Sequence, residues 1–229
     1  MSWPANLLSA VLVSAPLLSA AEPAPAKAPA LATDREKILY VMGALLGRPV
    51  SSLDLSEADV ALVAAGLADS ASRRPLRASA EEWGLRVSEF SQKRVSEIAA
   101  AEKKKATPFF EREGARPGTR RQPEGFLFRE VAAGTGPSPS PTGKVFISYT
   151  GTLADGTVFE TTSTVGRPVT FDLERVIPCW QKALPLMKAG GKARIVCPSE
   201  LAWGDFGHPP HVKPGAPVVF DLELVQVLK

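Results

Sequence analysis

The stretch KVFISYTGTLADGTVFETT, from Lys144 to Thr162, decides the fold of the second half of the chain. Apolar and polar residues alternate along its first part, and one side carries Val145, Ile147 and Tyr149. This two-residue period is that of a half-buried β-strand. The pair Asp155-Gly156 then marks a tight turn. The stretch therefore predicts an antiparallel hairpin made of residues 144–153 and 157–162.

The same period recurs before and after the hairpin, so more strands are expected there. Further strands are predicted at residues 125–131, 168–173, 192–197 and 217–228. Their apolar residues also fall on one side of each strand, as in the set Val169, Phe171 and Leu173 and the set Phe220, Leu222 and Leu224. Because antiparallel sheets bury one face, these sides are expected to meet in one core.

One short helix fits between the strands. It begins at Pro178, a residue suited to a first helical turn, and stops at Gly190-Gly191. Pro185 lies inside it and is expected to shorten or distort its last turn. The predicted fold class is α+β, with an antiparallel sheet wrapped around one short helix.

The first half of the chain has a helical period instead. Apolar stripes predict a helix over residues 34–46 that ends at Gly47. A second helix has Ser56 as its N-cap, an apolar pattern through Leu67 and a stop near Arg73 to Pro75. A longer helix starts near Ser79. It is expected to kink at Pro108, to continue as a second helical piece and to end at Gly114 and Pro117. The period changes from about 3.6 to 2 beyond Pro123, which places a domain boundary there. We expect a helical region at residues 34–117 and a strand-rich domain at 118–229.

Residues 1–33 carry a different signal. The apolar run from Leu7 to Leu18 is followed by small residues, as in a secretory signal peptide, and it is too short to cross a bilayer as a helix. We expect a signal peptide over residues 1–21 and a disordered Ala/Pro-rich linker over 22–33. The alternative is one disordered tail. A signal peptide implies a periplasmic or secreted protein.

The composition of the chain argues against several classes of function. The 229 residues are 45% hydrophobic and carry a formal charge of only +3, with scattered Lys and Arg, so nucleic acid is not an expected partner. Lys103, Lys104 and Lys105 are read as a solvated helix face. The only cysteines are Cys179 and Cys197, which fit either one disulfide or two buried thiols. Their spacing matches no common metal site, so neither a metal nor a cofactor is expected.

The strand-rich half supplies aromatic residues but almost no nucleophile or proton shuttle. Tyr149, Trp180 and Trp203 each combine an apolar ring with a polar edge, which suits a pocket rim better than a plain core. Such a pocket favours an uncharged ligand, for example a prolyl peptide, and a reaction without proton transfer.

Four segments carry a specific resemblance: YTGTLADGTVFETT, VIPCW, ALPLMKAGGKARIVCPSELAWG and GHPPHVKPGAPVVFDLELV. In order and nearly without gaps, they resemble the FKBP-type peptidyl-prolyl cis-trans isomerases over about the last hundred residues. The helical first half, followed by PEGFLFREVAAGTGPSP, more loosely resembles the dimerisation region of the macrophage infectivity potentiator group of bacterial envelope isomerases.

The resemblance implies a set of site residues. The catalytic set is Tyr149, Phe159, Glu160, Trp180, Trp203 and Phe220, with Trp180 as the floor. The substrate-binding set is Val169, Phe171, Val176, Ile177, His208 and Val212. The chain departs from the family pattern at Trp203, where Tyr is usual, at Glu160, where Asp is commoner, and at Val169, where an aromatic residue often sits. Glu160 is expected to accept a hydrogen bond from the Tyr149 hydroxyl or a nearby Arg, and His208 to shape the rim.

The resemblance also implies the activity, which is acceleration of X-Pro bond rotation in exported proteins by desolvation and transition-state binding. The expected partners are prolyl peptides and unfolded proteins, with macrolides as inhibitors. A homodimer is expected through residues 34–92, because their apolar stripes exceed what one small helical bundle buries. The alternative is a dimeric holdase chaperone or peptide-binding module with weak or no turnover.

Overall fold

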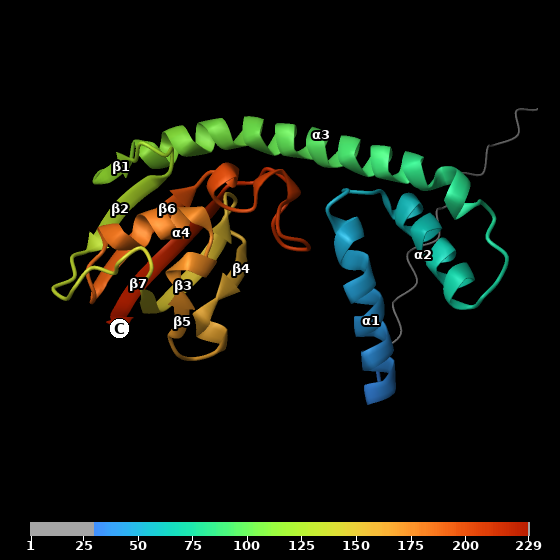
Figure 1. Ribbon diagram of the computed structural model, residues 1–229, viewed down its shortest axis with the longest axis horizontal. Coiled ribbons are helices and arrows are strands. Elements are labelled where there is room, and N and C mark those ends of the chain that lie inside the picture. Colours follow the sequence, from blue (N-terminus) through green and yellow to red (C-terminus); the bar gives the residue numbers. More distant parts are fainter. Residues whose placement is uncertain (1–29, 229) are drawn as a thin grey trace, which may run out of the picture. The chain divides into compact units, whose positions relative to one another are not determined.

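The computed structural model describes residues 30–228 as three helices followed by a strand-rich domain (Figure 1). Residues 41–228 form one compact unit, and Tyr40 ends another. The predicted signal peptide, and the predicted linker up to residue 29, lie outside the described residues. Among residues 30–228, no helix has both the length and the apolar character needed to cross a membrane.

Three helices occupy the predicted helical region, namely α1 (Asp34–Ser51), α2 (Glu57–Ala71) and α3 (Ala80–Gly114). Ser56 caps α2 as predicted, since its side chain accepts from the N–H of Asp59 and the Asp59 carboxylate accepts from the N–H of Ser56. Ser79 caps α3 by accepting from the N–H of Glu82. These bonds satisfy N–H groups that the first helical turn leaves without partners.

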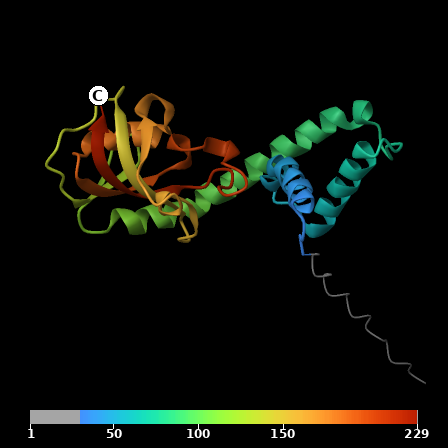
Figure 2. The ribbon, with the colours of Figure 1, turned by 90° about the horizontal axis from the view of Figure 1, so that it is seen from below.

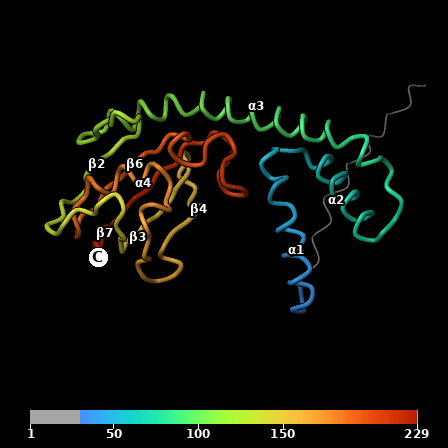
Figure 3. The backbone as a smooth tube through the Cα atoms, in the orientation of Figure 1, coloured from blue at the N-terminus to red at the C-terminus, as the bar shows by residue number. Residues whose placement is uncertain are grey.

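The predicted end of the first helix is wrong. The helix α1 does not stop at Gly47 but continues through Pro49 to Ser51, where the missing proline N–H costs one bond in the last turn. The helix α3 continues beyond Pro108 and ends at Gly114, as predicted, and Figure 3 shows it as one continuous coil. Phe109, the next residue, is buried with Leu127, Val196 and Val219 of the sheet. This burial offsets the lost hydrogen bond and keeps the helix continuous.

Seven antiparallel strands form one sheet in the order β1-β2-β6-β7-β3-β4, and β5 pairs with β3. Their bounds are β1 (Thr119–Arg121), β2 (Leu127–Ala132), β3 (Lys144–Leu153), β4 (Val158–Thr161), β5 (Val169–Asp172), β6 (Gly191–Cys197) and β7 (Val218–Leu228). The central strand β3 has the predicted bounds, and its buried residues alternate as expected. The strand β1 was not predicted, because it is short and polar and pairs with β2 through its backbone.

The short helix α4 (Pro178–Ala183) lies against one face of the sheet, and Figure 1 shows it in front of the strands. It continues as a 3₁₀ turn (Leu184–Leu186) that contains Pro185, as the predicted distorted last turn requires. Helix and sheet share the main core, which includes the fully buried Ile147, Leu184, Ile195 and Leu224. The predicted fold class is confirmed.

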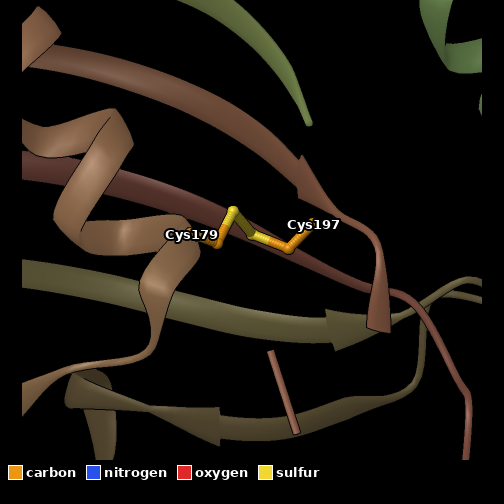
Figure 4. The surroundings of a disulfide bond; sticks show 2 residues. All are labelled: Cys179 and Cys197. Atoms are coloured by element: carbon orange, nitrogen blue, oxygen red, sulfur yellow. A yellow bond between two sulfur atoms is a disulfide. The ribbon is translucent and has the colours of Figure 1, made fainter. Parts of the chain in front are cut away.

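The two cysteines form a disulfide, which settles the alternative that the sequence left open (Figure 4). Cys179 lies in α4 and Cys197 ends β6, and their Cα atoms are 5.9 Å apart. Both residues are fully buried. Closing a loop across a sequence separation of 18 residues stabilises a fold by about 3 kcal/mol through the unfolded chain.

Reduction of this disulfide should therefore lower the free energy of unfolding by about 3 kcal/mol. Thermal unfolding with and without reductant measures the effect. In the Cys179→Ser/Cys197→Ser variant, which serves as the control, the reductant should change nothing. An unchanged midpoint of the wild-type protein in reductant would contradict the expectation.

Candidate functional site

A cavity of about 180 Å³ opens beside α4, where the helix meets the sheet and the loops around it. It is lined by Tyr149, Glu160, Phe171, Arg175, Val176, Ile177, Trp180, Trp203 and Phe220. These residues come from β3, β4, β5, β7, α4 and the connections that precede α4 and β7. Elements distant in sequence thus build one hollow.

The indole of Trp180 lies at the bottom of the aromatic cluster and is only 4% exposed. Its ring meets Tyr149, Phe171 and Phe220 edge to face, with centroids 4.9, 5.4 and 5.1 Å apart. Such edge-to-face pairs stabilise a cluster beyond the area they bury. Pro178 starts the helix and places Trp180 in its first turn, so the ring is held on a rigid element.

Two N–H groups at this bottom have no acceptor in the described part of the chain. The buried Nε1 of Trp180 makes no hydrogen bond there. The backbone N–H of Ile177, just before α4, likewise donates to no described residue. Buried donors are normally paired, so unpaired ones in a cavity wall are suited to a ligand carbonyl.

The rim of the cavity is made by Trp203 and by the side chains that hold it. Trp203 meets Phe159 edge to face at 5.8 Å, and His208 stacks on its other side at 5.1 Å and 19°. Phe159 in turn packs edge to face on Phe220 at 5.8 Å. A Cβ on Gly151 would lie 2.6 Å from the Phe159 ring, so only glycine fits beneath it.

The hydroxyl of Tyr149 is kept neutral by its surroundings. Burial raises the pKa of this phenol, and Glu160 raises it further, as hydrogen-bond acceptor and as negative charge. Tyr149 can therefore donate a hydrogen bond at any physiological pH. Arg175, exposed at the edge of the same cavity, brings a positive charge to a lining that is otherwise apolar or aromatic apart from Glu160.

Eight of the twelve residues predicted from the sequence line this cavity. The other four lie elsewhere: Phe159 and His208 pack against Trp203, Val212 is buried and pairs its backbone with His208, and Val169 lines a neighbouring hollow of about 470 Å³. Arg175 was missed. The sequence feature that could have indicated Arg175 was its position directly before Val176 and Ile177. The alternation of apolar residues does not point to a charged side chain.

Within residues 30–228, no three His, Cys, Asp or Glu side chains are arranged to hold a metal ion. The cavity itself offers an apolar, shaped hollow and a few hydrogen-bond donors.

Comparison with known proteins agrees with this geometry. Residues 136–225 match the family model described as FKBP-type peptidyl-prolyl cis-trans isomerase, and residues 35–129 match the domain amino-terminal to it. The outer membrane protein MIP of Legionella longbeachae is 33% identical over 88% of this chain and 89% of its own length. The isomerase FkpA of Escherichia coli K12 is 34% identical over 95% of this chain and 87% of its own.

Solved structures show the same relationship. The crystal structure of FkpA from Escherichia coli aligns with a TM-score of 0.62 at 31% identity, over 86% of this chain and 98% of that one. A peptidyl-prolyl cis-trans isomerase from Pseudomonas syringae aligns with a TM-score of 0.54 at 37% identity, over 57% of this chain and 96% of that one. With relatives of this identity matching along nearly its whole length, the chain belongs to the FKBP-type peptidyl-prolyl cis-trans isomerases.

Proposed function

We propose that this isomerase rotates X-Pro bonds in the cavity above Trp180, and that it serves exported proteins. The observation that carries the proposal is the single hollow in which the rings of Tyr149, Phe171, Trp180 and Phe220 meet edge to face. A proline ring is apolar and flat enough to lie against such a floor. No bond needs to be made or broken for the reaction.

The chemistry follows from amide resonance. Conjugation gives the X-Pro bond a rotation barrier of about 20 kcal/mol, and unaided exchange takes tens to hundreds of seconds. The planar amide is more charge-separated than the twisted one. An apolar cavity therefore destabilises the planar ground state relative to the twisted transition state, which lowers the barrier.

Directed hydrogen bonds add to this effect. In the proposal, the N–H of Ile177 and the indole N–H of Trp203 donate to substrate carbonyls, while the Tyr149 hydroxyl gives its single hydrogen to Glu160 and so holds the aromatic wall of the cavity in place. Because an indole cannot accept a hydrogen bond, Trp203 fills only part of the role that a tyrosine would have. Each tenfold gain in rate requires about 1.4 kcal/mol, so a few such contacts suffice.

The variant Trp180→Leu tests the cavity directly. Leucine keeps the floor apolar but removes the ring, so kcat/KM for a short prolyl peptide should fall at least about tenfold. Refolding of a proline-limited unfolded protein, measured in parallel, should lose the same catalysis if one site serves both substrates.

The matched control is Trp83→Leu, which changes an exposed tryptophan of α3 (46% exposed). It should leave peptide isomerisation unchanged. A Trp180→Leu protein that is folded and fully active would contradict the proposed site. If Trp83→Leu alone abolished the effect on the unfolded protein, binding along the helices would be the main activity instead.

The pH dependence of Tyr149 gives a second test. An unfolded tyrosine titrates near pH 10, and the folded pKa is higher, so the stabilisation by the neutral phenol is complete below about pH 10. It is lost as the pH rises beyond that value. Tyr149 should cause no change in activity between about pH 6 and 9.

Tyrosinate absorbance in the Tyr40→Phe variant reports Tyr149 alone, because the chain has two tyrosines. The folded protein should resist ionisation at a pH where the same protein in denaturant is ionised. Coincident titration curves would contradict the buried, acceptor-bound phenol.

We further propose that the protein is a homodimer of the bacterial cell envelope, with a signal peptide at residues 1–21, a linker at 22–33, a helical association region at 34–117 and the isomerase domain at 118–229.

The helices leave a large apolar surface uncovered, at Val41, Met42, Leu45, Leu46, Leu62, Leu85, Val87 and Phe90. A groove of about 1010 Å³, lined by residues that include Leu53, Val63, Trp83 and Phe90, continues this surface. Apolar patches of this extent favour association. The relative from Legionella longbeachae is named an outer membrane protein, which supports the envelope location.

Sedimentation at micromolar concentration should give twice the mass of one chain. Leu45→Glu, which places a charge on this surface, should shift the protein to a monomer while peptide isomerisation persists. A wild-type monomer under these conditions would refute the dimer.

A further inference from the structure

The loop between β6 and β7, residues 198–217, carries the rim of the cavity, and here it is called the rim loop. It contains Trp203 and His208 and only two short 3₁₀ turns, Ser199–Leu201 and Gly204–Phe206. The loop has backbone hydrogen bonds of its own, such as those between His208 and Val212, but it belongs to no long helix or sheet ladder, so contacts from neighbouring elements add to the definition of its position. The helix α3 supplies them, and Figures 1 and 2 both show the helix passing beside this loop.

Lys103 of α3 pairs with two carboxylates of the rim loop. Its ammonium lies 3.1 Å from Glu200 and 2.6 Å from Asp205. Both interactions raise the pKa of Lys103, that with Asp205 more strongly. The two acids stand on either side of Trp203 in sequence, so one ammonium holds both ends of the segment that presents the indole.

A second contact lies one helical turn earlier. Ala99 is buried, and its backbone packs so closely on Gly215 that a Cβ there would lie 2.5 Å from the Ala99 oxygen. Gly215 also has a positive φ of 71° and donates its N–H to the carbonyl of Gly204. Residues 99 and 103 share one face of α3. This face therefore meets the rim loop both near its start and near its end.

The connection between α1 and α2 reaches the same loop. The carboxylate of Asp54 lies 3.4 Å from the ammonium of Lys213, and Arg94 of α3 donates to the carbonyls of Leu53 and Asp54. These exposed contacts are individually weak. Together with Lys103 and Ala99, they place the rim loop against the helical region at three points.

We propose that Lys103 is a positioning residue for isomerisation, which acts through Glu200 and Asp205 on Trp203. Trp203 touches Phe159 and Phe220, so a displaced indole changes the shape of the cavity and the direction of its N–H donor. Misplacement by about 1 Å in a catalytic site can lower a rate by up to about 100-fold. This inference rests on the proposed function of the cavity.

The test compares Lys103→Met with wild type in prolyl peptide isomerisation. The variant should lose about threefold to tenfold in kcat/KM, since the loop is loosened but not removed. Lys103→Arg, which keeps the charge, should restore most of the activity. Raising the salt concentration should weaken wild type toward the variant, because salt screens exposed ion pairs. In residues 198–217, amide hydrogen exchange should be faster in Lys103→Met than in wild type and in Lys103→Arg.

Lys105→Met is the matched control, because it removes a neighbouring lysine that pairs within the helix with Glu102. It should behave as wild type. The double variant Glu200→Gln/Asp205→Asn approaches the same contact from the loop and should lose as much activity as Lys103→Met, without further loss when the changes are combined.

Unchanged kcat/KM and unchanged loop exchange in Lys103→Met would overturn the positioning role. A loss that Lys103→Arg does not restore, or that Lys105→Met shares, would overturn it as well. The proposed function stands or fails separately, through Trp180→Leu.

Discussion

The packing of α4 across the inner face of the sheet is the interaction on which the rest of the structure depends. The helix buries Trp180 among Tyr149, Phe171 and Phe220, which come from three different strands. The same contact closes the core and forms the floor of the cavity. Stability and catalytic geometry are thus set by one aromatic cluster, and a change that loosens the core also alters the site.

The cavity is small, and the aromatic rings that surround it constrain one another. Phe159 does not line it, yet Phe159 supports both Trp203 and Phe220, and Gly151 leaves room for its ring. The only charged groups at the wall are Glu160 and Arg175. In the proposed function, such a site takes up a flat apolar ring and recognises the peptide around it by a few hydrogen bonds.

The parts of the fold with a strong local period could be predicted from the sequence. The bounds of β3 follow from the alternation of apolar residues, and the N-caps Ser56 and Ser79 follow from their place before acidic first turns. The end of α3 at Gly114 was also predictable, whereas the burial of Phe109 against Leu127, Val196 and Val219 was not, because those strand residues are distant in sequence. The strand β1, with the sequence TRR, has no apolar residue that would mark it as a strand. It joins the sheet by pairing with β2. Eight of the residues implied by the family resemblance line the candidate cavity, whereas Arg175 and the contact of Lys103 with the rim loop depend on three-dimensional neighbours.

The disulfide has a topological effect on the cavity in addition to its effect on stability. Cys179 is the sequence neighbour of Trp180, and Cys197 is the last residue before the loop that carries Trp203. The bridge therefore shortens the covalent path between the two walls of the cavity, Trp180 in α4 and Trp203 in the rim loop. Without it, that path would run along the whole of β6 and the chain before it. Heat or denaturant can separate the side chains in between, but the two walls remain tethered neighbours in every state of the protein that keeps the bond.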